Sequence, residues 1–192
     1  MADTGYRFAT SSLVSTGSWT SLGNFFATDG AEAAVSIAAK NTSTVARLLT
    51  FGFTTSVIPV SSTINQVNLR CVWRVTTAAS VIANLGAAVF ISSVGLLSTH
   101  YNILEPTTLT TNTFDITGDR AWGPEDFRNG TLEVMASPFN GNDASDPFYR
   151  YDSISLDVIY TPPAVAAAQI IMGPCNLDGL GSDGRLPGNA LE

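Results

Sequence analysis

The segment from Thr63 to Thr77, TINQVNLRCVWRVTT, constrains the fold most, because its apolar and polar residues alternate over many positions. Side chains in a β-strand point alternately to opposite faces, so this pattern predicts a strand with one buried and one solvated face. The buried face is predicted to hold Val67, Leu69, Cys71, Trp73 and Val75. The same alternation returns in YDSISLDVIY, at residues 151–160. No segment of comparable length shows the period of an amphipathic helix.

Further short strands are indicated before and between these two. Alternating apolar residues predict strands near 33–39, 49–53, 87–91 and 132–136. Apolar residues among several threonines predict another near 109–116. Asn129-Gly130 is a hairpin signal, and Pro124 followed by two acids favours a single helical turn. Roughly eight strands at this spacing predict an all-β protein, an antiparallel β-sandwich. A jelly-roll-like strand order is favoured, and an immunoglobulin-like order stays open because the pattern does not define pairing.

The chain divides into three parts on composition. Residues 1–18 are rich in Ser and Thr and are predicted to form an N-terminal arm or an edge strand. Residues 19–162 are predicted to form the β-sandwich domain. Two successive prolines, Pro162-Pro163, cannot continue a sheet, and Gly and Pro recur after them, so 163–192 is predicted to be an extended C-terminal arm.

Charge and hydropathy exclude several functions. The chain carries 9 Lys plus Arg against 16 Asp plus Glu, a net charge of −7, so nucleic acid is not expected as a partner. No apolar stretch reaches the length of a membrane helix, and no partnership with a membrane is expected. A basic segment followed by an apolar one is absent at the N-terminus, so no secretion signal is expected.

No cofactor or metal is expected. Cys71 lies on the apolar face of the best strand, and a disulfide with Cys175 is not favoured. His100, the single histidine, lies in HYNILEP, a predicted loop without a nucleophile motif. Two acidic pairs in Gly- and Asn-rich segments could ligate calcium, but turn formation is the favoured explanation for both: Asp143 with Asp146, and Asp178 with Asp183.

Neither paired carboxylates nor aromatic residues define a catalytic centre. Glu125-Asp126 is more simply a helix-start pattern, and Asp115 with Asp119 has no sign of a cleft. No enzyme activity is therefore expected. The aromatic residues that could stack on a sugar are Trp19, Trp122, Phe139, Phe148, Tyr149 and Tyr151. For Trp19 and Trp122 we favour the alternative that they close the ends of the sandwich.

A further pattern comprises Trp19, Asp29-Gly30, the LLTFGF segment at 48–53, Ile64 with Val67, Trp122 with Asp126 and Phe127, and the segment Tyr151 to Pro162. Together these residues resemble a β-sandwich domain of tailed-bacteriophage virion proteins. The resemblance covers roughly residues 15 to 162 and implies a particle-bound structural role in the head or the tail. It carries no catalytic motif.

We therefore expect a structural virion protein, most simply a head decoration (cement) protein that binds the major capsid protein shell as a homotrimer. The alternative is a tail-associated adhesin that binds host glycan. The segments outside the predicted core should make the partner contacts, because they gain most by ordering on a partner. The expected partner-binding residues are Tyr6, Phe8, Ile170, Ile171, Met172, Leu177, Leu180 and Leu186.

Overall fold

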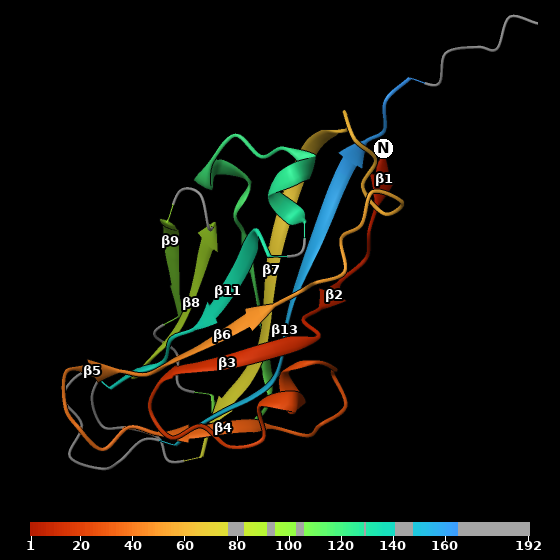
Figure 1. The fold of residues 1–192 in the computed structure, drawn as a ribbon. Helices are drawn as coiled ribbons and strands as arrows, with labels where there is room; N and C mark the ends of the chain where they lie inside the picture. The colour runs from red at the N-terminus through yellow and green to blue at the C-terminus, as the bar shows by residue number, and fades with distance from the viewer. Residues whose placement is uncertain (77–82, 92–94, 103–105, 129, 141–147, 165–192) are drawn as a thin grey trace, which may run out of the picture.

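The structure is a computed structural model that describes residues 1–76, 83–91, 95–102, 106–128, 130–140 and 148–164. Two antiparallel sheets face each other and bury one core between them (Figure 1). The predicted all-β sandwich is thus confirmed. Within these residues the helical elements are single 3-10 turns, η1 (Leu22–Phe25), η2 (Thr117–Asp119) and η3 (Pro124–Phe127), and none could cross a membrane.

The first sheet is built around its two longest strands. β13 (Phe148–Thr161) pairs with β7 (Thr63–Val75) along almost its whole length. β10 (Thr110–Asp115) forms the edge beyond β7. The other side of β13 pairs with three short strands from the start of the chain, β1 (Ala2–Asp3), β2 (Arg7–Phe8) and β4 (Ala33–Ser36).

The second sheet runs from the edge strand β3 (Ser11–Thr16) to β6 (Val45–Leu49), β11 (Leu132–Ala136) and β8 (Ala83–Ile91). β9 (Gly95–Asn102) pairs with β8. At the far end of β8, β12 (Phe139–Asn140) connects β8 to β5 (Thr42–Ser43).

The strand order is that of a jelly roll. One sheet reads β4-β13-β7-β10 and the facing sheet reads β6-β11-β8-β9, so that the chain crosses repeatedly between the two sheets. This pairing brings β13, the last strand, between β4 and β7. The strand pairing therefore decides between the jelly-roll order and the immunoglobulin-like order, which the sequence pattern left open.

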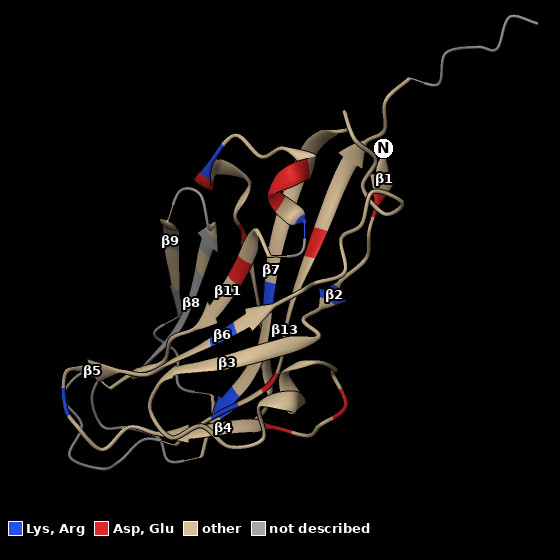
Figure 2. Cartoon of the chain, viewed as in Figure 1, with Lys and Arg blue, Asp and Glu red and all other residues tan. Residues whose placement is uncertain are grey.

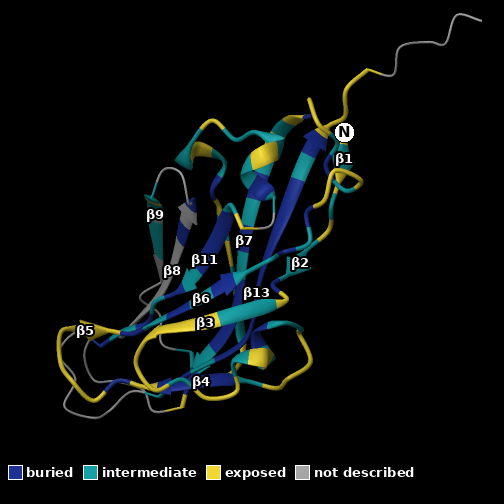
Figure 3. Ribbon diagram, in the orientation of Figure 1, coloured by how far each residue is buried: buried dark blue, intermediate teal, exposed yellow. Residues whose placement is uncertain are grey.

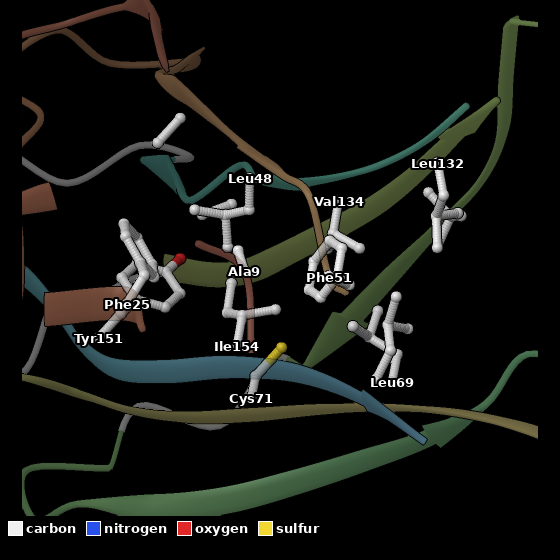
Figure 4. Close-up of a cluster of buried hydrophobic side chains, with 14 of the residues drawn as sticks. Ala9, Phe25, Leu48, Phe51, Leu69, Cys71, Leu132, Val134, Tyr151 and Ile154 are labelled. Carbon is white, nitrogen blue, oxygen red and sulfur yellow. The ribbon is translucent and has the colours of Figure 1, made fainter. Parts of the chain in front are cut away.

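The core holds the inward faces of both sheets. Trp73 is fully buried, as its position in the alternating strand predicted, and Cys71 and Leu69 follow it along β7. Figure 4 shows Leu69 and Cys71 pointing into the core from one side, with Leu48 and Val134 of the opposite sheet on the other. At about 25 cal/mol per Å² of buried apolar surface, this cluster is the main stabilising term of the fold.

Two sequence-based expectations about local structure were wrong. The strand expected near 49–53 ends at Leu49, because Thr50 and Gly52 adopt φ values of 60° and 71°, which strand backbone does not allow. Phe51 and Phe53 are buried all the same, from irregular backbone. His100 lies within β9, not in a loop.

The expected helical turn is confirmed. η3 has Pro124 at its first position, and the carboxylate of Asp126 accepts a hydrogen bond from the Gly123 amide at 2.7 Å. The sequence-based interpretation of Glu125-Asp126 as a helix-start pattern thus describes the local structure.

Candidate binding surface

Tyr6 and Phe8, two of the residues expected to contact a partner, lie at the side of the sandwich. Phe8 belongs to β2 and pairs with Ser155 of β13, and Arg7 pairs with Leu156. From here the chain crosses to β3 and the second sheet, where Thr10 is bonded to Leu49. The expected contact residues of the C-terminal arm lie outside the described residues.

The rings of Tyr6 and Phe8 face outward over the first sheet and meet Arg70 of β7. The guanidinium carbon of Arg70 lies 3.9 Å from the centre of the Tyr6 ring and 6.0 Å from that of Phe8. Arg70 also donates from Nε to the Ser155 hydroxyl at 3.2 Å. This stacking orients the rings and leaves the rest of the guanidinium available for an anion.

A shallow groove of about 550 Å³ runs along this segment. Its apolar walls come from three aromatic side chains besides Tyr6: Phe8, Phe26 and Phe51. Phe51 is buried and forms the floor, and the other rings are half-buried. The polar part of the lining includes Thr4, Arg7 and Thr10. The groove thus combines aromatic surface with hydroxyl and guanidinium donors.

Arg7 and Arg70 are distinguished from the other described arginines by their lack of a carboxylate partner within the described residues. The arginine ion pairs found there are Arg47–Glu133, Arg74–Glu32, Arg150–Glu32, Arg120–Asp126 and Arg128–Glu125. Arg7 instead donates to the Gly52 carbonyl at 3.2 Å and lies over the Phe53 ring. Figure 2 shows the corresponding basic segments on β2 and β7. In a chain of net charge −7, two such cations near one groove favour an anionic partner.

Two carboxylates lie beside this surface, on the same outer face of the first sheet. Burial raises the pKa of Asp157, and the neighbouring Asp3 carboxylate adds to this effect. The pKa of Asp3 is lowered, first by its hydrogen bond with Asp157 and then by the Gly5 amide. Thr4 fixes the end of β1 beside them, since its hydroxyl donates to Asp157 and accepts from the Val158 amide.

The sugar-stacking candidates do not form an exposed platform. Tyr149 and Tyr151 are fully buried, so neither can meet a ligand. Trp19 is half-buried against Phe25 and Tyr151, with ring centres 5.7 and 5.8 Å away. Trp122 is half-buried against Phe127, and its indole donates to the Ile116 carbonyl at 3.0 Å. Phe139 and Phe148 are also half-buried.

The remaining candidate side chains have structural roles or lie outside the described residues. His100 lies 2.9 Å from Asp119 and packs against Phe114. The carboxylate of Asp115 accepts a hydrogen bond from the Thr117 amide. The two calcium candidates, Asp143 with Asp146 and Asp178 with Asp183, and Cys175 are outside the described residues.

Neither a reactive thiol nor a metal centre emerges from the part of the chain that the structure describes. Cys71 is buried, and burial raises the pKa of its thiol to about 12, so the thiolate needed for nucleophilic chemistry is not formed near neutral pH. No cluster of three or more potential metal-ligating side chains occurs among the described residues.

Both ends of the described chain leave the sandwich at one pole. Ala2 pairs with Tyr160, so the N-terminus lies beside the end of β13 (Figure 1). Met1 is 93% exposed and Val60 56% exposed, and the Tyr160 hydroxyl bonds to the loop that carries Val60, at Val57. Thr161 and the three residues after it are exposed. This pole is defined by Met1, Val60 and residues 161–164, and it combines the N-terminus and the end of β13 with the exposed side chains of Met1 and Val60. Figure 3 shows exposed backbone around the N-terminus and beyond the end of β13.

No protein-family model and no curated protein matches the chain. Among solved structures it is similar to one described as "CBM4 structure and function", at 13% identity over 69% of this chain and 87% of that one, with a TM-score of 0.45. It is also similar to SGBP-B from a complex xyloglucan utilization locus in Bacteroides uniformis, at 14% identity over 79% and 46%, with a TM-score of 0.46. A third similarity is to the infectious bursal disease virus Gx strain structure, at 12% identity over 73% and 33%, with a TM-score of 0.32. The chain spans less than half the length of the last two.

Proposed function

We propose that this chain is a non-enzymatic structural protein of a tailed-bacteriophage virion, most simply a decoration protein on the outside of the head. The observation that carries this proposal is the pole where the N-terminus and the end of β13 lie together, with the side chains of Met1 and Val60 exposed. A protein that attaches through its chain ends to a shell needs both ends on the side facing that shell. The motif residues described above support the same role by resemblance.

In this proposal the mechanism is mass action. A protein that binds the assembled shell and not its separated subunits stabilises the shell by the free energy of binding at each site. The outer part of the molecule needs no reaction centre for such a role. The partner is the major capsid protein shell, and a homotrimer is the expected oligomer.

The proposal is tested on virions purified from a lysate of cells infected by the phage whose genome encodes the chain. Quantitative mass spectrometry should detect the chain at a fixed ratio to the major capsid protein. A copy number in the hundreds supports head decoration, and a few copies per particle supports a tail position. Absence from purified particles would overturn the virion role altogether.

A second experiment tests attachment through the pole. The full chain should co-sediment with capsids that lack it, whereas a chain ending at Pro163 should be folded by circular dichroism and fail to bind. Capsid binding that is unchanged after this truncation would contradict attachment through the C-terminal arm.

A tail-associated, glycan-binding adhesin is the second candidate. The observation in its favour is the aromatic groove at Tyr6 and Phe8, with the amides of Gln66 and Asn68 on the same outer face. It is tested by a glycan array with the full chain and with Tyr6→Ala. Binding that is lost in the variant would support it, and an empty array with a folded protein would count against it.

A further inference from the structure

We propose that the groove at Tyr6 and Phe8 receives the C-terminal segment, residues 165–192, of a second copy of this chain. The inference rests on the proposed function, in which copies lie side by side on a particle. The contact between the groove of one copy and the C-terminal segment of the next would join the copies, and the ligand of the groove would be an anionic, partly apolar peptide.

The groove offers two kinds of contact. Tyr6, Phe8 and Phe26 present half-buried rings that an apolar side chain can cover. Arg7 and Arg70 present guanidinium groups with no carboxylate partner among the described residues. A ligand that satisfies both must carry apolar side chains and acids within one short stretch.

The C-terminal segment has this composition. Its apolar residues include Ile170, Ile171, Met172 and Leu177, and acids follow at Asp178 and Asp183. Arg185 is its single basic residue. The charge is thus complementary to the groove, although the chain as a whole is acidic.

The course of β13 favours a neighbouring groove over the chain's own. Tyr160 pairs with Ala2 and Leu156 with Arg7, so β13 passes the groove first and then ends at Thr161, beside the N-terminus. Thr161 and Pro162 each precede a proline, which holds the backbone extended and opposes an immediate reversal. Residues 161–164 are exposed and lead the chain onward from its own groove.

The test is a photo-cross-link within the full-length protein. Tyr6 is replaced by p-benzoylphenylalanine, and ¹⁵N-labelled and unlabelled chains are mixed, irradiated and digested. We expect cross-linked peptide pairs of mixed isotope between position 6 and residues 165–192. The same replacement at Leu109, which is 42% exposed and far along the chain from the groove, is the matched control and should give no such pairs.

The alternatives give different results. If every cross-linked pair carried a single isotope, the segment would dock on its own chain, and this would overturn the proposal. An absence of tail cross-links would overturn it as well. If binding of acidic glycans on an array is then lost in Arg70→Gln, the groove is a saccharide site instead.

Light scattering provides an independent readout. Arg70→Gln should raise the dissociation constant of the oligomer about tenfold, because a charge partner in a partly buried contact is lost. Lys40→Gln, which removes one exposed positive charge elsewhere, should leave it unchanged. Equal effects of the two variants would contradict a specific role for Arg70.

Failure of this inference and failure of the proposed function are distinguishable. Mass spectrometry of purified particles reports the virion role without any dependence on Tyr6 or Arg70. Presence on particles without mixed-isotope cross-links would reject the groove contact and retain the structural role.

Discussion

The indole Nε1 of Trp73 donates a hydrogen bond to the side-chain oxygen of Asn112 at 2.6 Å, and so joins β7 to the edge strand β10. Asn112 is opposite Cys71 in the register, so this bond runs diagonally across the pair. It satisfies the indole of a fully buried tryptophan and an amide on the inner face of an edge strand. A polar pair of this kind costs free energy when either partner is left alone.

Replacement of this tryptophan should therefore destabilise the fold beyond its loss of apolar area. Trp73→Phe is expected to lower the free energy of unfolding by about 2–4 kcal/mol, from the lost hydrogen bond and the incompletely filled space. Urea denaturation followed by circular dichroism measures this. Trp122→Phe, at a half-buried indole that bonds a carbonyl, is the matched control and should cost less. An equal loss in both variants would contradict the role of the Asn112 bond.

Glu32 neutralises two arginines that lie directly opposite each other on neighbouring strands. It accepts from Arg74 at 2.5 and 2.8 Å and from Arg150 at 3.2 Å. Glu32→Gln should lower the free energy of unfolding by about 1–2 kcal/mol at pH 7, a value discounted because both arginines are about one-third exposed. Glu125→Gln, at an exposed carboxylate near Arg128, should change it little.

The same residue defines a pH dependence. The hydrogen bond from Arg74 is the largest cause that lowers the pKa of Glu32. A lowered folded-state pKa means that this stabilisation is fully present above the ordinary glutamate pKa and is lost as pH falls through the folded value. The difference between the parent and Glu32→Gln should therefore shrink below about pH 4.5. A difference that is constant from pH 7 to pH 3 would contradict this.

Asp3 and Asp157 should titrate as a pair. Because the pKa of Asp157 is raised, its contribution to stability falls as pH rises from the ordinary aspartate value through the raised one. Asp3→Asn keeps the acceptor for the Gly5 amide and removes a neighbouring carboxylate, so the pKa of Asp157 should fall towards 3.8. NMR titration of the Asp157 carboxyl measures this. An unchanged Asp157 titration in Asp3→Asn would contradict coupling, and Asp29→Asn is the control.

Two glycines separate backbone strain from steric clash. Gly17 and Gly30 share a left-handed backbone, with φ values of 85° and 84°. A Cβ added at Gly17 would lie 2.5 Å from the Thr44 side chain, whereas a Cβ added at Gly30 would have no neighbouring atom within 4 Å. Both alanine variants should lose about 1 kcal/mol from the left-handed backbone. Gly17→Ala should lose about 1–3 kcal/mol more, measured by thermal unfolding. Equal melting temperatures would show that Thr44 moves freely.

The fold class was predictable because burial acts on alternate residues of each strand. Leu69, Cys71 and Trp73 are buried as their alternation requires, and Leu132 and Val134 are buried in β11. The strand expected at 49–53 failed because backbone conformation at Thr50 and Gly52, not hydrophobicity, ends β6. Hydrophobic periodicity reports which side chains are buried, and it does not report where the backbone can remain extended.

The candidate groove was only half predictable. Tyr6 and Phe8 were expected to contact a partner because their segment has few apolar residues of its own. Nothing in the sequence placed Arg70 over their rings, since this contact depends on β13 lying between β2 and β7. The expectation that Tyr149 and Tyr151 could stack on a sugar failed because β13 is covered on its inward face by the second sheet.

The sequence by itself determined that this protein is a β-sandwich, which face of β7 is buried and where the sheet ends, at Pro162-Pro163. Each of these follows from local chemistry, namely side-chain alternation and the missing proline donor. Only the tertiary structure decided the jelly-roll order, the pole where the N-terminus lies beside the end of β13 and the groove beside Arg70. These depend on hydrogen bonds between residues far apart in the chain, and many pairings of the same strands would bury the same apolar faces.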